Sequence, residues 1–212
     1  MKYRNIVWDW NGTLLDDVEV GVNTLNDMLT KRGLKTLSQE EYKDKFGFPV
    51  VDFYHAIGFD MEKESLHEIS VDFVETYDLY GREVKLHTAV SKVLAEIQRR
   101  GYRQYILSAL REDLLQDMLT VFSIGERFEK ACGSDNIYAA GKIDRGLRML
   151  KDCTINPAET LMVGDTLHDA EVAAALGFDC VLYSGGHNSE WRLRQKGPVI
   201  SRLEQLIEEK LS

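Results

Sequence analysis

The chain has 212 residues, which is enough for one domain or for a compact core with a small insert. Hydrophobic residues make up 44% and charged residues 29%, a globular composition that excludes collagen-like, low-complexity and wholly disordered chains. The net charge of -9 makes the chain a poor polyanion binder, so we expect no nucleic-acid partner. The one basic cluster, Arg99, Arg100 and Arg103, is typical of a solvated helix end.

The sequence contains no pattern for a membrane segment or a secretion signal. The longest apolar stretch runs only from Val172 to Phe178, whereas a membrane span needs about 20 such residues. The first residues lead straight into a strand-like run, so we expect no signal peptide and no membrane partner. Three widely spaced cysteines without a Cys-x-x-Cys motif argue against a disulfide framework or a zinc ribbon. We therefore expect a cytoplasmic protein.

Short apolar runs predict the strands. Because the runs are continuously apolar and do not alternate with polar residues, they are typical of parallel strands buried on both faces. The runs are 6–8, 105–107, 161–163 and 180–183, with a weaker one at 130–132.

Helical patterns separate these runs from about residue 85 onward. Between residues 88 and 100, apolar residues recur at i, i+3, i+4 and i+7, and Gly101 follows where a C-cap glycine belongs. This alternation of strand and helix predicts an α/β fold with a doubly wound, Rossmann-like parallel sheet. Further helical patterns cover 114–122, 145–150 and 170–175.

One segment interrupts the alternation because it contains helical patterns only. The patterns lie at 18–29, 39–45, 51–57 and 63–80. We therefore predict an α/β core domain, residues 1–16 and 82–212, and an inserted helical cap domain, residues 17–81. Inserted blocks of this kind often move as lids over a site. The alternative is that the block only adds packing.

Polar residues follow three of the predicted strands. Asp9 follows the first, Ser108 the second and Asp165 the third, with Asp169 four residues further on. Ligands bind at the carboxyl ends of strands in open parallel sheets, so we expect these residues to meet in one crevice. A single aspartate in this place is usually a helix cap or a turn residue. Three such groups in one chain favour a shared site.

These residue types suit phosphate chemistry. Carboxylates such as Asp9 and Asp165, together with waters, are the ligands that Mg²⁺ prefers, and a carboxylate can also attack phosphorus. Ser108 offers a hydroxyl, and we expect the N–H groups after it to begin a helix, which is a natural phosphate seat. Lys142, on a loop before the helix 145–150, can neutralise phosphate charge. Taken alone, Lys142 is a surface lysine.

Together these residues resemble the haloacid dehalogenase (HAD) superfamily of aspartate-nucleophile phosphatases, and they occur in that family's order. The matching pieces are Asp9-x-x-Gly12-Thr13-Leu14, Ser108, Lys142 and Gly164-Asp165-x-x-x-Asp169. The resemblance spans nearly the whole chain. The helical insert is similar to the small cap of the phosphoglycolate-phosphatase-like branch.

The resemblance implies a metal site and a nucleophile. Asp9 is expected to be the nucleophile and a Mg²⁺ ligand. Asp165 and the backbone oxygen of Asn11 are expected to complete the protein ligands. Thr13 would orient the nucleophile, and Asp169 would hold Lys142 or a metal-bound water.

The resemblance also implies a phosphate site and a specificity loop. Ser108, the N–H group of Ala109 and Lys142 would bind the phosphoryl group. The segment Phe46-Gly47-Phe48-Pro49, between two cap helices, is similar to the cap's substrate-specificity loop. The same Gly and Pro are also typical of an ordinary turn.

Asn11 departs from the family pattern, in which a second aspartate acts there as general acid and base. An amide cannot exchange this proton, and general acid–base catalysis contributes about 10²–10⁴-fold. We therefore expect weak turnover of poor leaving groups, and a gain on Asn11→Asp. Three explanations stay open: His55, His168 or His187 supplies the proton, the substrate needs none, or Asn11 deamidates. The Asn that often follows the serine in the family is here Ala109, and the Lys142 loop lacks the usual prolines.

The sequence predicts a Mg²⁺-dependent phosphomonoester hydrolase acting on a small phosphorylated metabolite, with 2-phosphoglycolate as one candidate. One alternative is a catalytically impaired homologue that only binds a phosphorylated ligand. A dehalogenase is a weaker alternative, because those relatives work without the metal and lack the paired Asp165 and Asp169. A structural or partner-binding protein would bind neither metal nor phosphate. The sequence makes no prediction of the oligomeric state.

Overall fold

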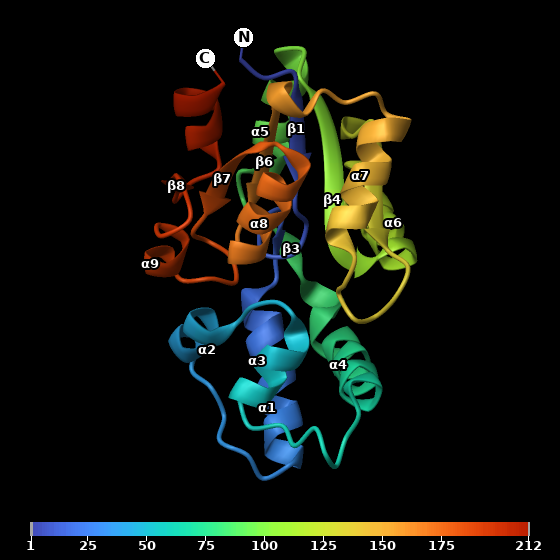
Figure 1. Ribbon diagram of the computed structural model, residues 1–212, viewed down its shortest axis with the longest axis vertical. Helices are drawn as coiled ribbons and strands as arrows, with labels where there is room; N and C mark the ends of the chain where they lie inside the picture. The colour runs from blue at the N-terminus through green and yellow to red at the C-terminus, as the bar shows by residue number, and fades with distance from the viewer. Residues whose placement is uncertain (1, 212) are drawn as a thin grey trace.

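The computed structural model describes residues 2–211 and is built around a parallel six-stranded sheet (Figure 1). The strand order β5-β4-β1-β6-β7-β8 confirms the predicted doubly wound α/β fold, because β1 lies centrally and the chain crosses over to either side of it. The strands are β1 (Asn5–Trp8), β4 (Arg103–Arg111), β5 (Lys130–Ser134), β6 (Thr160–Gly164), β7 (Asp179–Tyr183) and β8 (Val199–Ile200).

Helices cover both faces of this sheet. Ile6 and Trp8 of β1 pack into the apolar cluster on one face, while Val7 between them packs into the cluster on the other. Successive side chains of a strand point to opposite faces, so a strand covered on both sides reads as a continuous apolar run. The first face carries α5 (Val90–Arg99) and α6 (Glu112–Val121), and the second carries α7 (Lys142–Asp152) and α8 (Leu167–Leu176).

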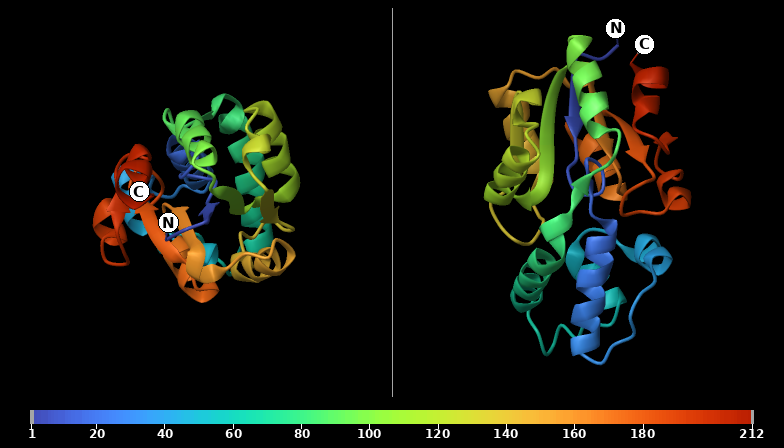
Figure 2. Two further views of the ribbon diagram at one scale, coloured as in Figure 1. Left: turned by 90° about the horizontal axis from the view of Figure 1, so that it is seen from above. Right: turned by 180° about the vertical axis from the view of Figure 1, so that it is seen from behind.

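A block of four helices lies beyond the carboxyl end of the sheet (Figures 1 and 2). Its apolar residues form a separate cluster that includes Leu25, Met28 and Phe53. Ser38 and Ser65 form capping boxes that set the starts of two of its helices. The helices are α1 (Val18–Lys31), α2 (Gln39–Lys45), α3 (Val50–Ala56) and α4 (Leu66–Tyr80).

Short elements complete the described chain. The strands β2 (Leu15–Asp16) and β3 (Lys85–Leu86) pair antiparallel where the chain leaves and re-enters the sheet layer. Two-residue strands contain no periodicity, so neither these nor β8 were predicted. No helix of the described residues combines the length and apolar character needed to cross a membrane. The remaining elements are α9 (Glu190–Leu193) and the single turns 81–83, 125–127, 157–159 and 206–210.

Two sequence expectations near the carboxyl edge of the sheet are wrong. β4 does not end at Ser108 but continues to Arg111, with an irregular register after Leu107. Helix α6 therefore begins only at Glu112, and the N–H groups directly after Ser108 do not open a helix. Lys142 lies not on a loop but at the first position of α7, after Gly141 in the left-handed conformation (φ 74°).

Candidate active site

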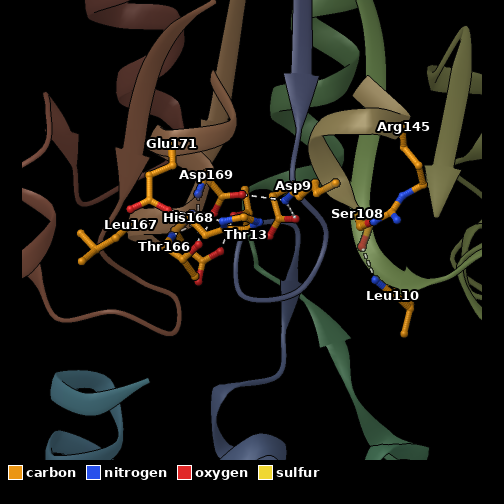
Figure 3. A network of polar contacts seen from close by, with 12 residues as sticks. Asp9, Thr13, Ser108, Leu110, Arg145, Thr166, Leu167, His168, Asp169 and Glu171 are labelled. Carbon is orange, nitrogen blue, oxygen red and sulfur yellow. Dashed lines mark hydrogen bonds and ion pairs between the residues drawn. The ribbon is translucent and has the colours of Figure 1, made fainter. Parts of the chain in front are cut away.

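Three buried carboxylates meet at the carboxyl edge of the sheet. Asp9 directly follows β1, Asp165 directly follows β6, and Asp169 lies in the first turn of α8. The Asp9 N–H group donates to the Val163 carbonyl (2.9 Å), which fixes the end of β1 beside β6. One carboxylate oxygen from each of the three residues lies within 4.8 Å of the others. The two strand ends thus place Asp9 and Asp165 together. Figure 3 shows Asp169 beside Asp9.

Lys142 joins two of these carboxylates. Its Nζ donates to Oδ1 of Asp9 (2.5 Å) and to Oδ1 of Asp169 (2.6 Å), and its side chain is only 3% exposed. Burial by itself lowers the pKa of the ammonium group, but the two carboxylates outweigh this and raise the pKa above its ordinary value. Lys142 is therefore a permanent positive charge at the floor of the site.

The charges of the site do not balance without a further cation. Burial raises the pKa of Asp9 well above its usual range; Lys142 opposes the rise, while Asp169 and Asp165 add to it. Burial also raises the pKa of Asp165, against the influence of His187. Three carboxylates thus face one lysine. A divalent cation with oxygen ligands would relieve this repulsion, so the donor set fits Mg²⁺.

Asp169 is already used by the protein on both oxygens. Its Oδ1 accepts from Lys142, and its Oδ2 accepts from the Thr166 N–H group (3.0 Å) and the Thr166 hydroxyl (2.7 Å). The bond from the Thr166 N–H group and the reciprocal bond from the Asp169 N–H group to the Thr166 hydroxyl (3.3 Å) form the capping box that starts α8. Asp169 is thereby fixed as the partner of Lys142, which leaves Asp9 and Asp165 as the carboxylates best placed to hold a cation.

Thr13 contacts a different carboxylate from the one expected. Its hydroxyl donates to Oδ1 of Asp165 (2.7 Å), whereas the family resemblance implied that it orients Asp9. The His187 N–H group donates to the other oxygen of Asp165 (2.6 Å). Gly12 has a φ of 73°, and a Cβ atom there would overlap the Asp165 side chain, so this turn requires glycine. The loop after β1 therefore positions Asp165.

Asp17 is a site residue that the sequence reading missed. It stands at the N-cap of α1, but its side chain makes no capping bond. Its carboxylate instead accepts from Nδ2 of Asn11 (2.8 Å), from the Gly12 N–H group (2.7 Å) and from the Tyr77 hydroxyl (2.8 Å). Nothing in the sequence indicated this contact with Asn11.

His187 completes the buried cluster around Asp17. Its Nε2 lies 3.2 Å from Oδ1 of Asp17 and its Nδ1 lies 2.8 Å from the Tyr42 hydroxyl. Burial alone lowers the pKa of the imidazole, but Asp17 and Asp165 raise it to about 9. In turn, burial would raise the pKa of Asp17, yet His187 and the hydrogen bonds hold it below its usual value. The two residues form a buried ion pair between the sheet layer and the helical block.

Ser108 lies apart from the carboxylates (Figure 3). Its hydroxyl accepts from the Leu110 N–H group (3.0 Å) and its carbonyl accepts from Nη2 of Arg145 (3.1 Å). Of the described residues that line the central cavity, Ala109 is one and Ser108 is not. The structure therefore brings Ala109, but not Ser108, to the cavity.

A cavity of about 570 Å³ connects the carboxylates with the helical block. Asp9, Asn11 and Lys142 line it on the sheet side. Phe46 and Phe48 line it from the segment 46–49, which joins α2 to α3 as predicted. Of the three candidate histidines, His168 and His187 line the cavity, whereas His55 is exposed on α3 and does not. The size is that of a small-molecule site.

Replacing Lys142 with methionine is expected to lower the free energy of unfolding by about 3–5 kcal/mol in a buffer without divalent cations, because two buried carboxylates lose their cation. Urea denaturation measures this change. Lys151→Met, at an exposed position of the same helix, is the matched control and is expected to change stability by less than about 0.5 kcal/mol. Equal urea midpoints for the two variants would show that Lys142 does not compensate these charges.

The family model described as haloacid dehalogenase-like hydrolase matches residues 6–183. The chain belongs to the haloacid dehalogenase-like hydrolase family. The match includes the strand ends that supply Asp9 and Asp165, Lys142 at the start of α7, and the helical insert.

Individual relatives are distant in sequence. A tyrosine-protein kinase, PtkA of Mycobacterium tuberculosis, is 26% identical over 86% of this chain, and the chain spans only 62% of its length. A phosphoglycolate phosphatase of Pseudomonas fluorescens is 26% identical over 96% of this chain and 78% of its own. A solved structure described as a predicted phosphatase from Clostridium acetobutylicum superimposes with a TM-score of 0.81 at 18% identity, covering 100% of this chain and 99% of that one. Because the identity with the Clostridium acetobutylicum structure is only 18%, this comparison shows a shared fold alone.

Proposed function

We propose that the protein is a Mg²⁺-dependent phosphomonoester hydrolase that acts on a small phosphorylated metabolite through an aspartyl-phosphate on Asp9. The observation that carries the proposal is the buried group of Asp9, Asp165 and Asp169 around Lys142 at the floor of a cavity. The phosphoglycolate phosphatase relative, which aligns along 96% of this chain, supports the same reaction class.

The chain's own residues account for most of the reaction. A carboxylate oxygen of Asp9 attacks phosphorus, the ester P–O bond breaks, and the alcohol oxygen leaves with the bonding electrons and takes a proton from solvent. Water then attacks the phosphorus of the aspartyl-phosphate and gives a proton to solvent, the acyl phosphate P–O bond breaks, and phosphate and the carboxylate of Asp9 result. Lys142 holds Asp9 and balances the charge of the phosphoryl group. Mg²⁺, held by Asp9, Asp165 and the Asn11 carbonyl, would supply further positive charge at the phosphoryl oxygens.

The proposed roles of the remaining residues follow the same geometry. Asp169 and Thr13 act as positioning residues, because they hold Lys142 and Asp165 respectively. Ala109, at the cavity wall, is proposed to bind the phosphoryl group through its N–H group. Ser108 would join it only after its hydroxyl leaves the Leu110 N–H group.

The helical block, residues 17–81, is proposed to act as a cap that selects the substrate. Its residues supply one wall of the cavity, and Phe46 and Phe48 reach that wall from the proposed specificity loop. Polar bonds join the block to the sheet layer near this loop: Nδ2 of Asn188 donates to the Phe46 carbonyl (2.8 Å), as does Nη1 of Arg192 (2.7 Å).

We expect phosphate release from para-nitrophenyl phosphate to require a divalent cation. An activated phenol leaves without a proton, so the amide of Asn11 costs little in the step that forms the aspartyl-phosphate from this substrate. Turnover is measured with Mg²⁺, after removal of metal by EDTA, and after excess Mg²⁺ is added back. The expected result is activity with Mg²⁺, background release in EDTA and recovery on readdition. Release that is indifferent to EDTA would contradict the proposal and favour a metal-independent hydrolase.

A catalytically impaired phospho-ligand binder is the second candidate, and Asn11 favours it. The same residues that would bind substrate are present, but the position of the family's general acid holds an amide bonded to Asp17. Such a protein would bind Mg²⁺ and phosphate analogues and release no phosphate even from the activated ester. Thermal stabilisation by Mg²⁺ with vanadate, in the absence of turnover, would identify it.

A further inference from the structure

The wall of the cavity opposite the carboxylates is aromatic. Seven aromatic side chains of the helical block line it. Four of them, Phe46, Phe48, Phe73 and Tyr77, are partly exposed to the cavity, while Tyr42, Phe53 and Tyr54 are buried behind. Phe46 packs edge-on against Phe48 (centroids 5.5 Å apart) and against Phe53 (5.2 Å), so these rings form a continuous surface.

The charged groups of the cavity disfavour a leaving group that carries a negative charge. Among the lining residues that the structure describes, lysine and arginine occur only as Lys142 and Arg111. Lys142 is bound to Asp9 and Asp169, and Arg111 is bound through Nε (2.5 Å) and Nη2 (2.8 Å) to both oxygens of Asp113. His187, the other cation of the lining, is paired with Asp17. An anion placed against the aromatic wall would therefore lose water, and the cation left for it is Arg111, which it would share with the exposed Asp113.

The helical block adds acidic residues to the same cavity. Glu75 and Asp78 of α4 line its rim and are exposed, and Asp17 lies deeper. Asp17 is balanced by His187, so Glu75 and Asp78 are the carboxylates that repel a carboxylate or a second phosphate on the substrate. Because both are exposed, water and salt screen this repulsion, and they screen the attraction of a cation equally. The aromatic rings remain the main source of affinity for the leaving group.

We propose that the substrate is a phosphomonoester whose leaving group is uncharged and largely apolar, with an aromatic ring or a similar flat body against the cap wall. The inference rests on the proposed phosphatase function, since it takes the phosphoryl group to lie beside Asp9. It assigns to this site a substrate class different from the small carboxylate of phosphoglycolate. The cavity of about 570 Å³ has room for a ring beyond the phosphoryl group.

The test compares four primary alkyl phosphates that share the same ester chemistry and differ only in the group that the alcohol carries. They are ethyl, phenethyl and aminoethyl phosphate, and phosphoglycolate. We expect kcat/KM for phenethyl phosphate to exceed that for phosphoglycolate by about 10- to 100-fold, mostly through KM, because burial of a phenyl ring contributes about that factor. Ethyl phosphate should lie between the two. A preference for phosphoglycolate or for aminoethyl phosphate would overturn the inference.

A charge placed in the wall provides a second test. Val74 lines the cavity from α4, so Val74→Lys gives a carboxylate-bearing substrate a cation. The kcat/KM ratio of phosphoglycolate to phenethyl phosphate is expected to rise by about 3- to 10-fold or more. Leu79→Lys adds the same charge on the same helix, at a side chain that is 62% exposed, and should leave the ratio within about twofold. An unchanged ratio in Val74→Lys would count against the assigned wall.

Failure of the inference differs from failure of the proposed function. If Mg²⁺-dependent release from para-nitrophenyl phosphate is present and phosphoglycolate is preferred, only the substrate class is wrong. If no ester is hydrolysed, the rise in Tm is compared for phenylpropylphosphonate and phosphonopropionate, which cannot turn over. A larger shift with the phenyl compound supports the apolar site in a binding protein, and an equal or larger shift with the carboxylate refutes it.

Discussion

Asp9→Asn is expected to reduce metal-dependent phosphate release by at least about 10³-fold, to the background rate, because the amide cannot form the aspartyl-phosphate. The variant should remain folded. Burial already raises the pKa of Asp9, so a neutral side chain is well tolerated there, and Lys142 keeps Asp169 as its partner. Release of phosphate from para-nitrophenyl phosphate and the Tm of the variant are measured together.

Asp16→Asn is the matched control for this variant. Asp16 ends β2, directly after the loop that follows Asp9, and its carboxylate is 58% exposed and lies 3.7 Å from Nδ1 of His87. The same chemical change there should leave turnover within about threefold of the unmodified protein. Full activity in Asp9→Asn would remove Asp9 as the nucleophile, and equal losses in both variants would point to a disturbed loop.

The double variant Asn11→Asp/Asp17→Asn is expected to raise kcat for alkyl phosphates by about 10²–10⁴-fold, because it places a carboxylic acid where the family's general acid lies. The exchange keeps the hydrogen bond between the two side chains, which now joins Nδ2 of Asn11 to Oδ2 of Asp17 at 2.8 Å. A phosphate ester of an activated phenol needs no proton in the first step, so its kcat should rise less, and only as far as water attack on the aspartyl-phosphate limits it.

The single variant Asn11→Asp should gain much less than the sequence alone suggests. It would set a second carboxylate against the buried Asp17, and two such neighbours cannot both ionise without cost. Asp17→Asn alone supplies no acid and serves as the control. The measured quantity is the ratio of kcat for ethyl phosphate to kcat for para-nitrophenyl phosphate. A ratio in the double variant no higher than in the unmodified chain would contradict this assignment of Asn11 and Asp17.

The surroundings of the three candidate histidines differ in how well they suit a proton donor. His187 lines the cavity, but its two ring nitrogens already face Asp17 and the Tyr42 hydroxyl. His168 packs beside Phe48, with ring centroids 4.8 Å apart. His55 is exposed and does not line the cavity. His187 is thus engaged and His55 lies outside the lining, whereas His168 lines the cavity with Nδ1 3.6 Å from Glu171 and stays a candidate proton donor.

Much of the fold could be predicted because local patterns and tertiary burial agree in the sheet. The run at residues 6–8 is apolar at every position because β1 is covered on both faces, and Gly101 follows α5 in the left-handed conformation (φ 84°). The parts that were not predicted have no such pattern. β2 and β3 are each two residues long, and their pairing joins segments about seventy residues apart.

The sequence by itself determined the chemistry at the strand ends. Asp9 and Asp165 follow buried apolar runs, and parallel strands bring their carboxyl ends to one edge, so their meeting follows from topology. Only the tertiary structure decided which side chains engage one another. β4 continues past Ser108, and the Ser108 hydroxyl accepts from the Leu110 N–H group. Asp17 stands at the N-cap position of α1, but its carboxylate accepts from Asn11 and does not cap the helix. These hydrogen-bond partners depend on packing between segments that are distant in the chain. The spacing of residues along the sequence does not indicate such packing.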